Sequence, residues 1–341
     1  MSVLEHILIA KETTPEGLAA VEALAGAANV TVLAPLEEET ELAPGLAARC
    51  TVLLADVPPR NLAAMPRLAW FQLSSAGYEH IAGLPLSAGG VRVTNASGVN
   101  DIPIAEWCLA MMIIFERDIR GLLEMQRRRG WERLTKYQSE LRGRRVGIVG
   151  YGSIGREVAR VCAGLGLEVW AMSRGPIGPR PGHYCVAGAG DPGGVIPART
   201  FRLEQMADFL PHLDYLILTL PLSTATQGLI GEAELRSLPP TAVLLNPSRG
   251  PLVNEEALVR ALREEWISGA ALDTHFQYPL PPEHPLWSLP NVILTPHISG
   301  STGSRLFLPR LWDLFAQNLG RYLRGEPLLN EIAPADLAGS A

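Results

Sequence analysis

Three polar side chains of types used in binding and proton transfer each follow a short apolar run late in the chain. Arg249 follows "TAVLLNPS", Asp273 lies in "SGAALDT" and His297 ends "NVILTPH". An arginine can hold a carboxylate through two parallel hydrogen bonds, and a histidine can exchange a proton with a hydroxyl or carbonyl oxygen near neutral pH. Taken one at a time, Arg249 could be a surface charge, Asp273 a helix cap and His297 a hydrogen-bonded core residue.

The elements that must position these side chains are predicted by apolar runs without polar alternation. Six such runs ("RRVGIVG", "LEVWAMS", "LDYLILTL", "TAVLLNPS", "SGAALDT" and "NVILTPH") are separated by segments of helical length. This pattern is typical of a parallel sheet with helices on both faces. Side chains at the carboxyl ends of parallel strands line the crevice where ligands bind. We therefore expect Arg249, Asp273 and His297 to converge.

A glycine motif follows the first of these runs. Gly150, Gly152 and Gly155 stand in "VGIVGYGSIGREVARVCAGLG", between an apolar strand and a helix-forming segment. Glycine makes up 33 of 341 residues, so G-x-G-x-x-G alone is a weak signal. Between a strand and a helix, however, the backbone can approach a pyrophosphate and the helix start offers free N–H groups. We predict a dinucleotide site that includes Tyr151, Ser153 and Ile154; a tight turn without a ligand is the alternative.

The end of the second run distinguishes between the possible cofactors. An acid there would bind the ribose hydroxyls of NAD, but the chain reads "AMSRG". Ser173 can donate to a 2′-phosphate and Arg174 can pair with its charge. The sequence therefore favours NADP(H) over NAD(H), unless Arg174 points into water. Arg180, further along, is a candidate for a second charge at that phosphate.

The rest of the chain predicts a second α/β unit and three further segments. "HILIA", "VTVLA", "TVLLAD" and "LAWFQLS" in the first hundred residues are again apolar runs separated by helical lengths. The segment "NDIPIAEWCLAMMIIFERDIRGLLEMQRR" is predicted to be one long helix, buried between domains, between subunits or within the chain. Residues 175–200, rich in Gly and Pro, are predicted to form a surface loop. A last helix, in "RLFLPRLWDLFAQNLGRYLRG", should end at Gly325.

Composition excludes several classes of protein. The chain has 341 residues, 47% hydrophobic, and a formal net charge of −6; this predicts two globular domains and argues against nucleic acid or an anionic membrane as partner. No apolar run reaches the roughly 20 residues of a membrane span, and "MSVLEHILIA" lacks the features of an export signal. Cys50, Cys108, Cys162 and Cys185 lie far apart, which predicts reduced thiols, no metal site and a cytoplasmic protein.

In order and spacing, the motifs resemble those of the D-isomer-specific 2-hydroxyacid dehydrogenases over nearly the whole chain. The resemblance is carried by "SSAGYEHI", "GVNDIPIAEWCLAMM", "VGIVGYGSIGREVA", "NPSRGPLVNEEAL" and "PLPPEHPLWSLPNVILTPHISGST". It implies an α/β protein with two doubly wound parallel-sheet domains. These would be a flavodoxin-like substrate domain, residues 1–100 and 299–341, and a Rossmann dinucleotide-binding domain, residues 101–298. It also implies a homodimer, which we expect to form through residues 101–128.

The resemblance also implies roles for single residues. Arg249 would bind the carboxylate of a small 2-oxo or D-2-hydroxy acid, and His297 would be the acid/base during hydride transfer with the nicotinamide. Asp273 would hold the carboxamide of the cofactor. The substrate carboxylate would also be bound by the backbone of Ser75, Ala76 and Gly77. The remaining positions expected to line the cofactor are Leu220, Pro221, Thr226, Pro247, Ser248 and Gly300.

One position departs from the family pattern. Where family members usually carry a glutamate that supports the protonated histidine, this chain has Tyr278. A phenol can hydrogen-bond an imidazole but carries no charge at neutral pH, so we expect His297 to titrate near about 6.5 or lower. Two alternatives to a 2-oxo acid reductase stay open. One is a dinucleotide-binding regulator, sensor or corepressor-like, with weak or lost catalysis. The other is formate dehydrogenase-like activity, since those related enzymes carry an uncharged amide here.

Overall fold

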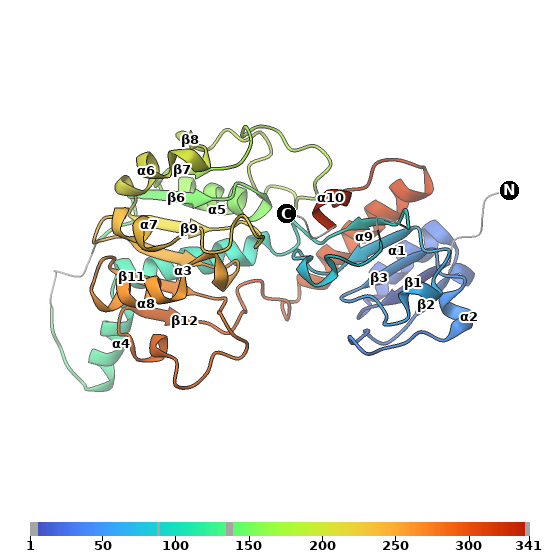
Figure 1. The fold of residues 1–341 in the computed structure, drawn as a ribbon, viewed down its shortest axis with the longest axis horizontal. Coiled ribbons are helices and arrows are strands. Elements are labelled where there is room, and N and C mark those ends of the chain that lie inside the picture. The colour runs from blue at the N-terminus through green and yellow to red at the C-terminus, as the bar shows by residue number, and fades with distance from the viewer. Residues whose placement is uncertain (1–5, 87–88, 134–138, 338–341) are drawn as a thin grey trace. The chain divides into compact units, whose positions relative to one another are not determined.

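The computed structural model describes residues 6–86, 89–133 and 139–337, which form two compact units (Figure 1). Unit 1 comprises Met1–Asn100, Pro181–Val186 and Thr302–Ala341, and unit 2 comprises Asp101–Arg180 and Ala187–Ser301. Residues 1–5, for which we expect no export signal, lie outside the described part.

Unit 1 is built on a five-stranded parallel sheet in the order β2-β1-β3-β4-β5. Its strands are β1 (Ile7–Ala10), β2 (Val30–Val32), β3 (Val52–Ala55), β4 (Trp70–Leu73) and β5 (Arg92–Thr94). This is the flavodoxin-like order, as expected from the resemblance. Every residue of β1, β3 and β4 is buried, which explains why these strands show no polar alternation. The strand β5, of three residues, was not predicted from the sequence.

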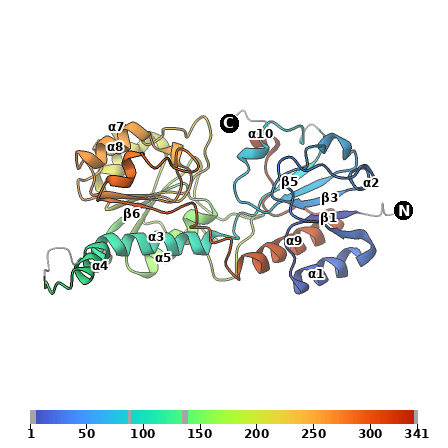
Figure 2. The same ribbon diagram turned by 90° about the horizontal axis from the view of Figure 1, so that it is seen from below.

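Two long helices, α1 (Pro15–Ala25) and α9 (Phe307–Leu323), lie side by side in unit 1 (Figure 2). A Cβ atom at Gly17 would lie 2.4 Å from the ring of Trp312, so the glycine permits their close approach. Gly325, with φ of 70°, follows the end of α9 as predicted. The short helices of unit 1 are α2 (Pro44–Ala47) and α10 (Pro334–Leu337).

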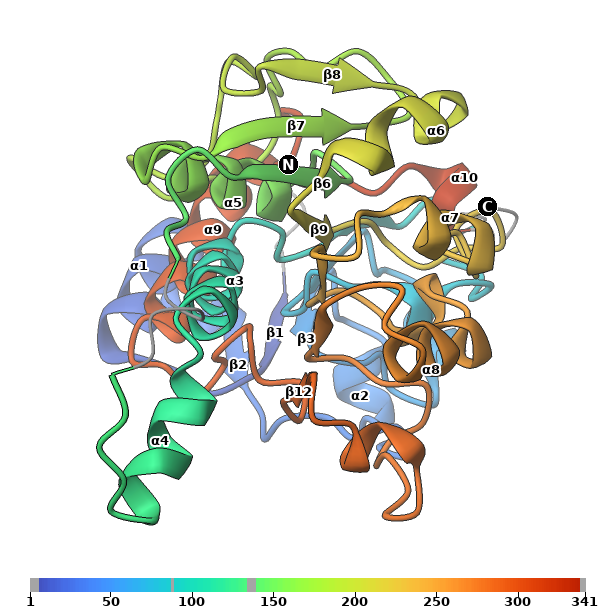
Figure 3. The ribbon, with the colours of Figure 1, turned by 90° about the vertical axis from the view of Figure 1, so that its left-hand side faces the viewer.

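Unit 2 contains a seven-stranded parallel sheet in the order β12-β11-β10-β9-β6-β7-β8. Figure 3 shows β8 at one edge and β12 at the other. The strands are β6 (Arg145–Val149), β7 (Glu168–Met172), β8 (Arg199–Phe201), β9 (Tyr215–Leu218), β10 (Val243–Asn246), β11 (Gly269–Leu272) and β12 (Val292–Leu294). Six of them are the runs predicted from the sequence, and the arrangement is of the Rossmann type. The exception is β8, whose first two residues are exposed.

The predicted single long helix is wrong, because the segment forms two helices. The helix α3 (Asp101–Glu116) packs on α5 (Ser153–Gly164), whereas α4 (Ile119–Arg127) begins after Asp118. Asp118 is left-handed, with φ of 44°, and its carboxylate accepts a hydrogen bond of 3.2 Å from the Gly121 N–H. Aspartate tolerates this conformation and is a good N-cap, so the break is stabilised locally.

The remaining helices of unit 2 are α6 (Met206–Phe209), α7 (Glu232–Ser237) and α8 (Glu255–Arg263). Short 3-10 helices are η1 (Ala27–Asn29), η2 (Leu62–Ala64), η3 (Glu79–Ile81), η4 (Leu203–Gln205), η5 (Leu210–His212), η6 (Gly250–Leu252) and η7 (Pro285–Ser288). In the described ranges, no helix is both long enough and apolar enough to cross a bilayer.

The Gly/Pro-rich segment is a loop, but part of it is built into unit 1. Residues 175–198, all of them described, contain no helix or strand. Tyr184 is nevertheless buried: its hydroxyl donates to Asp313 over 2.9 Å, and its N–H donates to the side chain of Asn330 over 3.0 Å. The loop is thus an ordered connection that contributes to the core of unit 1.

A buried amide on α9 leads to the first prediction. The Asn318 Nδ2 donates to Gln72 Oε1 (3.1 Å) and to the Leu329 carbonyl (3.0 Å), while its Oδ1 accepts from the Leu329 N–H (2.7 Å). Asn318→Ala leaves these buried groups unpaired, so the free energy of unfolding should fall by about 2–4 kcal/mol in urea denaturation. Gln317→Ala, at the neighbouring exposed position, should change it by less than about 0.5 kcal/mol. Equal losses would contradict this account.

Candidate active site

The glycine turn between β6 and α5 has the shape of a phosphate cradle. Gly150 is left-handed, with φ of 97°, and a Cβ there would lie 2.9 Å from Leu220. A Cβ at Gly155 would lie 2.3 Å from the Gly150 carbonyl oxygen. At Gly152 the nearest atom to a Cβ would be an Arg180 nitrogen at 3.7 Å. Packing therefore requires the first and third glycines, while the second leaves room at the start of α5, which fits a dinucleotide diphosphate.

The side chains between these glycines serve the fold. Tyr151 is buried, and its hydroxyl donates to Asp191 over 2.7 Å. Ile154 packs against the hydrophobic core of unit 2. Ser153 is the first residue of α5. The first turn of a helix can meet a diphosphate through backbone N–H groups that have no acceptor within the helix itself.

The end of β7 carries the residues predicted to select the cofactor. Ser173 donates its hydroxyl hydrogen bond to the Gly175 carbonyl, and Arg174 is exposed. The Arg202 guanidinium donates to the Arg174 carbonyl, so a second cation lies here. No sequence motif pointed to Arg202, which follows the unpredicted strand β8. Arg180, which the sequence offered as the second charge at the 2′-phosphate, lies beside Gly152 instead.

Arg249, Asp273 and His297 follow β10, β11 and β12, which are neighbours in the sheet. Asp273 is fully buried (0% exposed), and its carboxylate accepts hydrogen bonds from the Thr295 hydroxyl (2.5 Å) and from the N–H groups of Ile298 (2.9 Å) and Ser299 (2.9 Å). Its carbonyl accepts from the His297 N–H over 2.8 Å. Asp273 thus holds the turn on which His297 adopts a left-handed φ of 56°.

The electrostatic surroundings of His297 favour the neutral imidazole. The residue as a whole is exposed, but partial burial of its imidazole lowers the pKa below its ordinary value. The positive charge of Arg249 lowers the pKa further, and so does His275, while Asp273 acts in the opposite direction. The charge of Arg249 therefore acts on the imidazole of His297.

Tyr278 contacts His297 through its ring. The two ring centroids are 5.6 Å apart with an angle of 48° between the planes. The phenol oxygen instead accepts a hydrogen bond of 3.2 Å from the His275 N–H. Among the residues that the structure describes, His297 makes no side-chain hydrogen bond. His275, which no sequence motif indicated, is buried, and its Nε2 lies 2.8 Å from the Thr295 carbonyl oxygen.

Two further loops of unit 2, which follow the carboxyl ends of β9 and β10, are joined by a hydrogen bond. The Thr226 hydroxyl donates to the Pro221 carbonyl over 2.8 Å, and the Ser248 hydroxyl donates to the Leu220 carbonyl over 2.5 Å. Pro247 precedes Ser248, and Gly300 follows the turn held by Asp273. Leu220 also lies against Gly150, so these loops are continuous with the glycine turn.

The candidate substrate loop belongs to unit 1, where it follows β4. The Ser75 hydroxyl donates to the Gly77 carbonyl over 2.7 Å, and Asn95 donates to the Ala76 carbonyl over 2.8 Å. Within the described ranges, the backbone N–H groups of Ser75, Ala76 and Gly77 have no hydrogen-bond acceptor. Such N–H groups can bind an anion.

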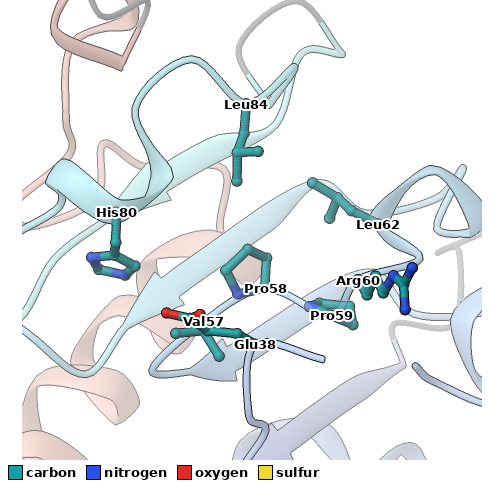
Figure 4. Close-up of a pocket in the computed structure, with 8 residues that line it drawn as sticks. All are labelled: Glu38, Val57, Pro58, Pro59, Arg60, Leu62, His80 and Leu84. Atoms are coloured by element: carbon teal, nitrogen blue, oxygen red, sulfur yellow. The ribbon is translucent and has the colours of Figure 1, made fainter. Parts of the chain in front are cut away.

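Two surface hollows lie apart from these residues. One, of about 250 Å³, lies in unit 1 and contains none of the predicted site residues (Figure 4); it is lined by Glu38, Val57, Pro58, Pro59, Arg60, Leu62, His80 and Leu84. The other, of about 290 Å³, includes Arg144, Asp214 and Ser268. These residues precede strands of unit 2, so this hollow lies at the amino ends of the strands, opposite the carboxyl ends that carry the candidate site. No group of three His, Cys, Asp or Glu suited to a metal ion occurs in the described part of the chain.

Comparison with known proteins gives a consistent result. The family described as "D-isomer specific 2-hydroxyacid dehydrogenase, NAD binding domain" matches residues 109–299. The glyoxylate reductase of Thermofilum pendens is 34% identical over 269 residues, covering 77% of this chain and 74% of that protein.

Two solved structures resemble the whole chain. The D-isomer specific 2-hydroxyacid dehydrogenase from Xanthobacter autotrophicus Py2, in complex with NADPH and MES, has a TM-score of 0.77 at 26% identity, covering 98% of this chain and 99% of that one. The probable 2-hydroxyacid dehydrogenase from Rhizobium etli, in complex with NADP, HEPES and L(+)-tartaric acid, has a TM-score of 0.72 at 26% identity, with coverages of 98% and 99%.

The unequal crowding of the glycines leads to the second prediction. Gly155→Ala forces a methyl group to 2.3 Å from the Gly150 carbonyl, so unfolding in urea should show a loss of about 1–3 kcal/mol. Gly152→Ala, with its nearest neighbour at 3.7 Å, should stay within about 0.5 kcal/mol of the parent but bind dinucleotide more weakly. Similar stability losses in both variants would argue against the cradle described here.

Proposed function

This chain belongs to the D-isomer specific 2-hydroxyacid dehydrogenase family, and on that premise we propose that it is an NADPH-dependent reductase of a small 2-oxo acid. The observation that carries the proposal is the placement of Arg249 and His297. Arg249 follows β10 and His297 follows β12, with β11 between these two strands, in the same sheet whose strand β6 leads into the glycine cradle. The positive charge of Arg249 lowers the pKa of His297. The relative from Thermofilum pendens, a glyoxylate reductase, supports a small substrate of this class.

The preference for NADP(H) over NAD(H) rests on the end of β7. Ser173 and Arg174 replace the acid that would bind the ribose hydroxyls of NAD. Arg202 adds a second cation beside Arg174. Fork-shaped guanidinium groups suit a phosphate. The two structural relatives above, solved with NADPH and with NADP, support the same choice.

The residues of unit 2 provide the binding and proton transfer that the reaction needs. A bound nicotinamide supplies the hydride that reaches the carbonyl carbon. Arg249 binds the carboxylate of the 2-oxo acid and draws electron density from the carbonyl group. Protonated His297 donates an imidazole N–H proton to the carbonyl oxygen, which completes the 2-hydroxy acid. In the reverse direction, neutral His297 accepts the hydroxyl proton.

Other residues hold the two ligands. Asp273, which is fully buried and accepts three hydrogen bonds from its own chain, is assigned to the cofactor carboxamide as the resemblance implies. Further cofactor contacts are assigned to the loops that contain Leu220, Pro221, Thr226, Pro247, Ser248 and Gly300. The N–H groups of Ser75, Ala76 and Gly77, which have no acceptor in the described ranges, are assigned to the substrate carboxylate.

Assembly and location complete the proposal. We assign a homodimer to residues 101–128, where Ile113 on α3 and Leu122 and Leu123 on α4 are exposed apolar side chains. All four cysteines are free thiols, as in proteins of reducing compartments, and we assign the protein to the cytoplasm. The regulatory and formate dehydrogenase-like alternatives receive no support from the comparisons.

Turnover gives the third prediction. NADPH should be oxidised in the presence of at least one of glyoxylate, hydroxypyruvate, pyruvate and phenylpyruvate, and more efficiently than NADH. His297→Asn removes the proton donor, so kcat should fall by roughly 10²–10⁴-fold while NADPH still binds, as measured by fluorescence titration. Tight NADPH binding without turnover of any 2-oxo acid would instead favour the dinucleotide-binding regulator.

The pH dependence gives the fourth prediction. Reduction requires protonated His297, and its pKa is lowered by burial and by Arg249. The protonated fraction falls as pH rises through that lowered value. As pH is raised, kcat/KM for reduction should therefore start to fall at a pH lower than about 6.5. Oxidation, which needs the neutral form, should persist to the same lower pH.

Substitutions of Tyr278 test whether His297 is the group whose titration causes this decline. Tyr278→Glu places a carboxylate beside the imidazole, which favours the charged form and raises its pKa, so the decline should move up by about one pH unit or more. Tyr278→Gln is the neutral control and should leave the decline where it is in the parent. A decline at one pH in all three proteins would show that His297 is not the titrating acid.

A further inference from the structure

The loop of residues 175–198 is tied to the dinucleotide cradle by a buried carboxylate. Asp191 is 3% exposed and accepts hydrogen bonds from the Tyr151 hydroxyl (2.7 Å) and from the N–H groups of Val195 and Ile196 (3.0 Å each). Tyr151 stands between the first two glycines of the cradle. The far part of the loop is therefore anchored on the turn that would receive the diphosphate.

A second anchor comes from α5. The buried guanidinium of Arg156 donates to the carbonyl groups of Asp191 and, over 2.7 Å, of Gly178. A Cβ at Gly194 would lie 2.7 Å from the Gly178 nitrogen, so these two loop segments touch through their backbones. The glycines of this loop thus permit close packing, and residues near Gly178 are held in place.

Arg180, two positions after Gly178, is presented to the cradle by these anchors. Its Nη1 is the nearest atom to a Cβ built on Gly152, at 3.7 Å. The side chain is half-buried; burial lowers its pKa, Arg156 lowers it further and Asp101 raises it. The guanidinium of Arg180 thus lies beside Gly152 at the start of α5, where the helix N-terminus favours a bound diphosphate.

We propose that Arg180 binds the diphosphate of the cofactor at Gly152. The assignment rests on the proposed function, because it requires a nicotinamide dinucleotide in this cradle. A guanidinium can add charge-assisted hydrogen bonds to those from the N–H groups of the first turn of α5. The Gly/Pro-rich loop then has a role: it carries a cation to a cradle whose own residues, 150–155, bear no charge.

This role differs from that of Arg174 in a measurable way. The diphosphate is common to NADPH and NADH, whereas the 2′-phosphate occurs only in NADPH. Loss of Arg180 should weaken both nucleotides by the same factor, and loss of Arg174 should weaken NADPH alone. A side chain that only stabilises the loop would change thermal stability without changing affinity.

The experiment is a fluorescence titration of NADPH and NADH with the parent, Arg180→Gln, Arg180→Lys and Arg174→Gln, together with thermal unfolding of each without nucleotide. For Arg180→Gln we expect Kd to rise by roughly 10–100-fold for both nucleotides, as for the loss of a charged hydrogen-bonding partner. Arg180→Lys retains the charge without the fork and should show a smaller rise for both. Arg174→Gln is the matched control, with a rise for NADPH only.

The outcomes separate this assignment from the proposed function. A rise of Kd for NADPH alone in Arg180→Gln would show that Arg180 binds the 2′-phosphate and would overturn the assignment. Unchanged Kd values with a lower melting temperature would also overturn it, in favour of a structural role. If the parent binds neither nucleotide, the proposed function fails and the assignment fails with it. If both Kd values rise as expected but no 2-oxo acid is reduced, the assignment stands and the substrate proposal fails.

Discussion

The buried carboxylate of Asp273 is the contact on which the arrangement of the candidate site depends. It lies at the end of β11 and binds the turn that follows the neighbouring strand β12. A buried charge must be satisfied by hydrogen bonds, and here the donors are backbone N–H groups and one hydroxyl on either side of His297. The left-handed backbone of His297 is held in this way, so the position of the imidazole follows from the fold of the sheet.

The charged groups around the imidazole of His297 together disfavour its protonated form. The closest aromatic partner, Tyr278, uses its oxygen to accept a hydrogen bond from the His275 N–H. Arg249 and His275 both disfavour the imidazolium, and Asp273 supports it only in part, since the pKa remains lowered. The histidine is therefore set to act as a stronger acid than an isolated imidazole, which suits donation of a proton to a carbonyl oxygen.

The Gly/Pro-rich loop shows how an irregular segment can be fully specified. Its order comes from the hydrogen bonds of Asp191 with Tyr151 and of Arg156 with backbone carbonyl groups. It then contributes Tyr184 to the core of unit 1. Such contacts join residues far apart in sequence and have no periodicity, which is why the composition of the loop predicted only its lack of helix and strand.

The sequence by itself determined the two parallel-sheet units, because buried strands and helices have local patterns: the strands β1 and β3 are apolar throughout, and every residue of β1, β3 and β4 is buried. It also determined the glycine turn and the end of α9 at Gly325, where backbone conformation depends on residue type. Only the tertiary structure decided the edge strands β5 and β8, each of three residues. The same holds for the location of Arg180 at Gly152 and the presence of His275 and Arg202 beside the site. These features depend on which distant segments meet, and no local pattern in the chain records that.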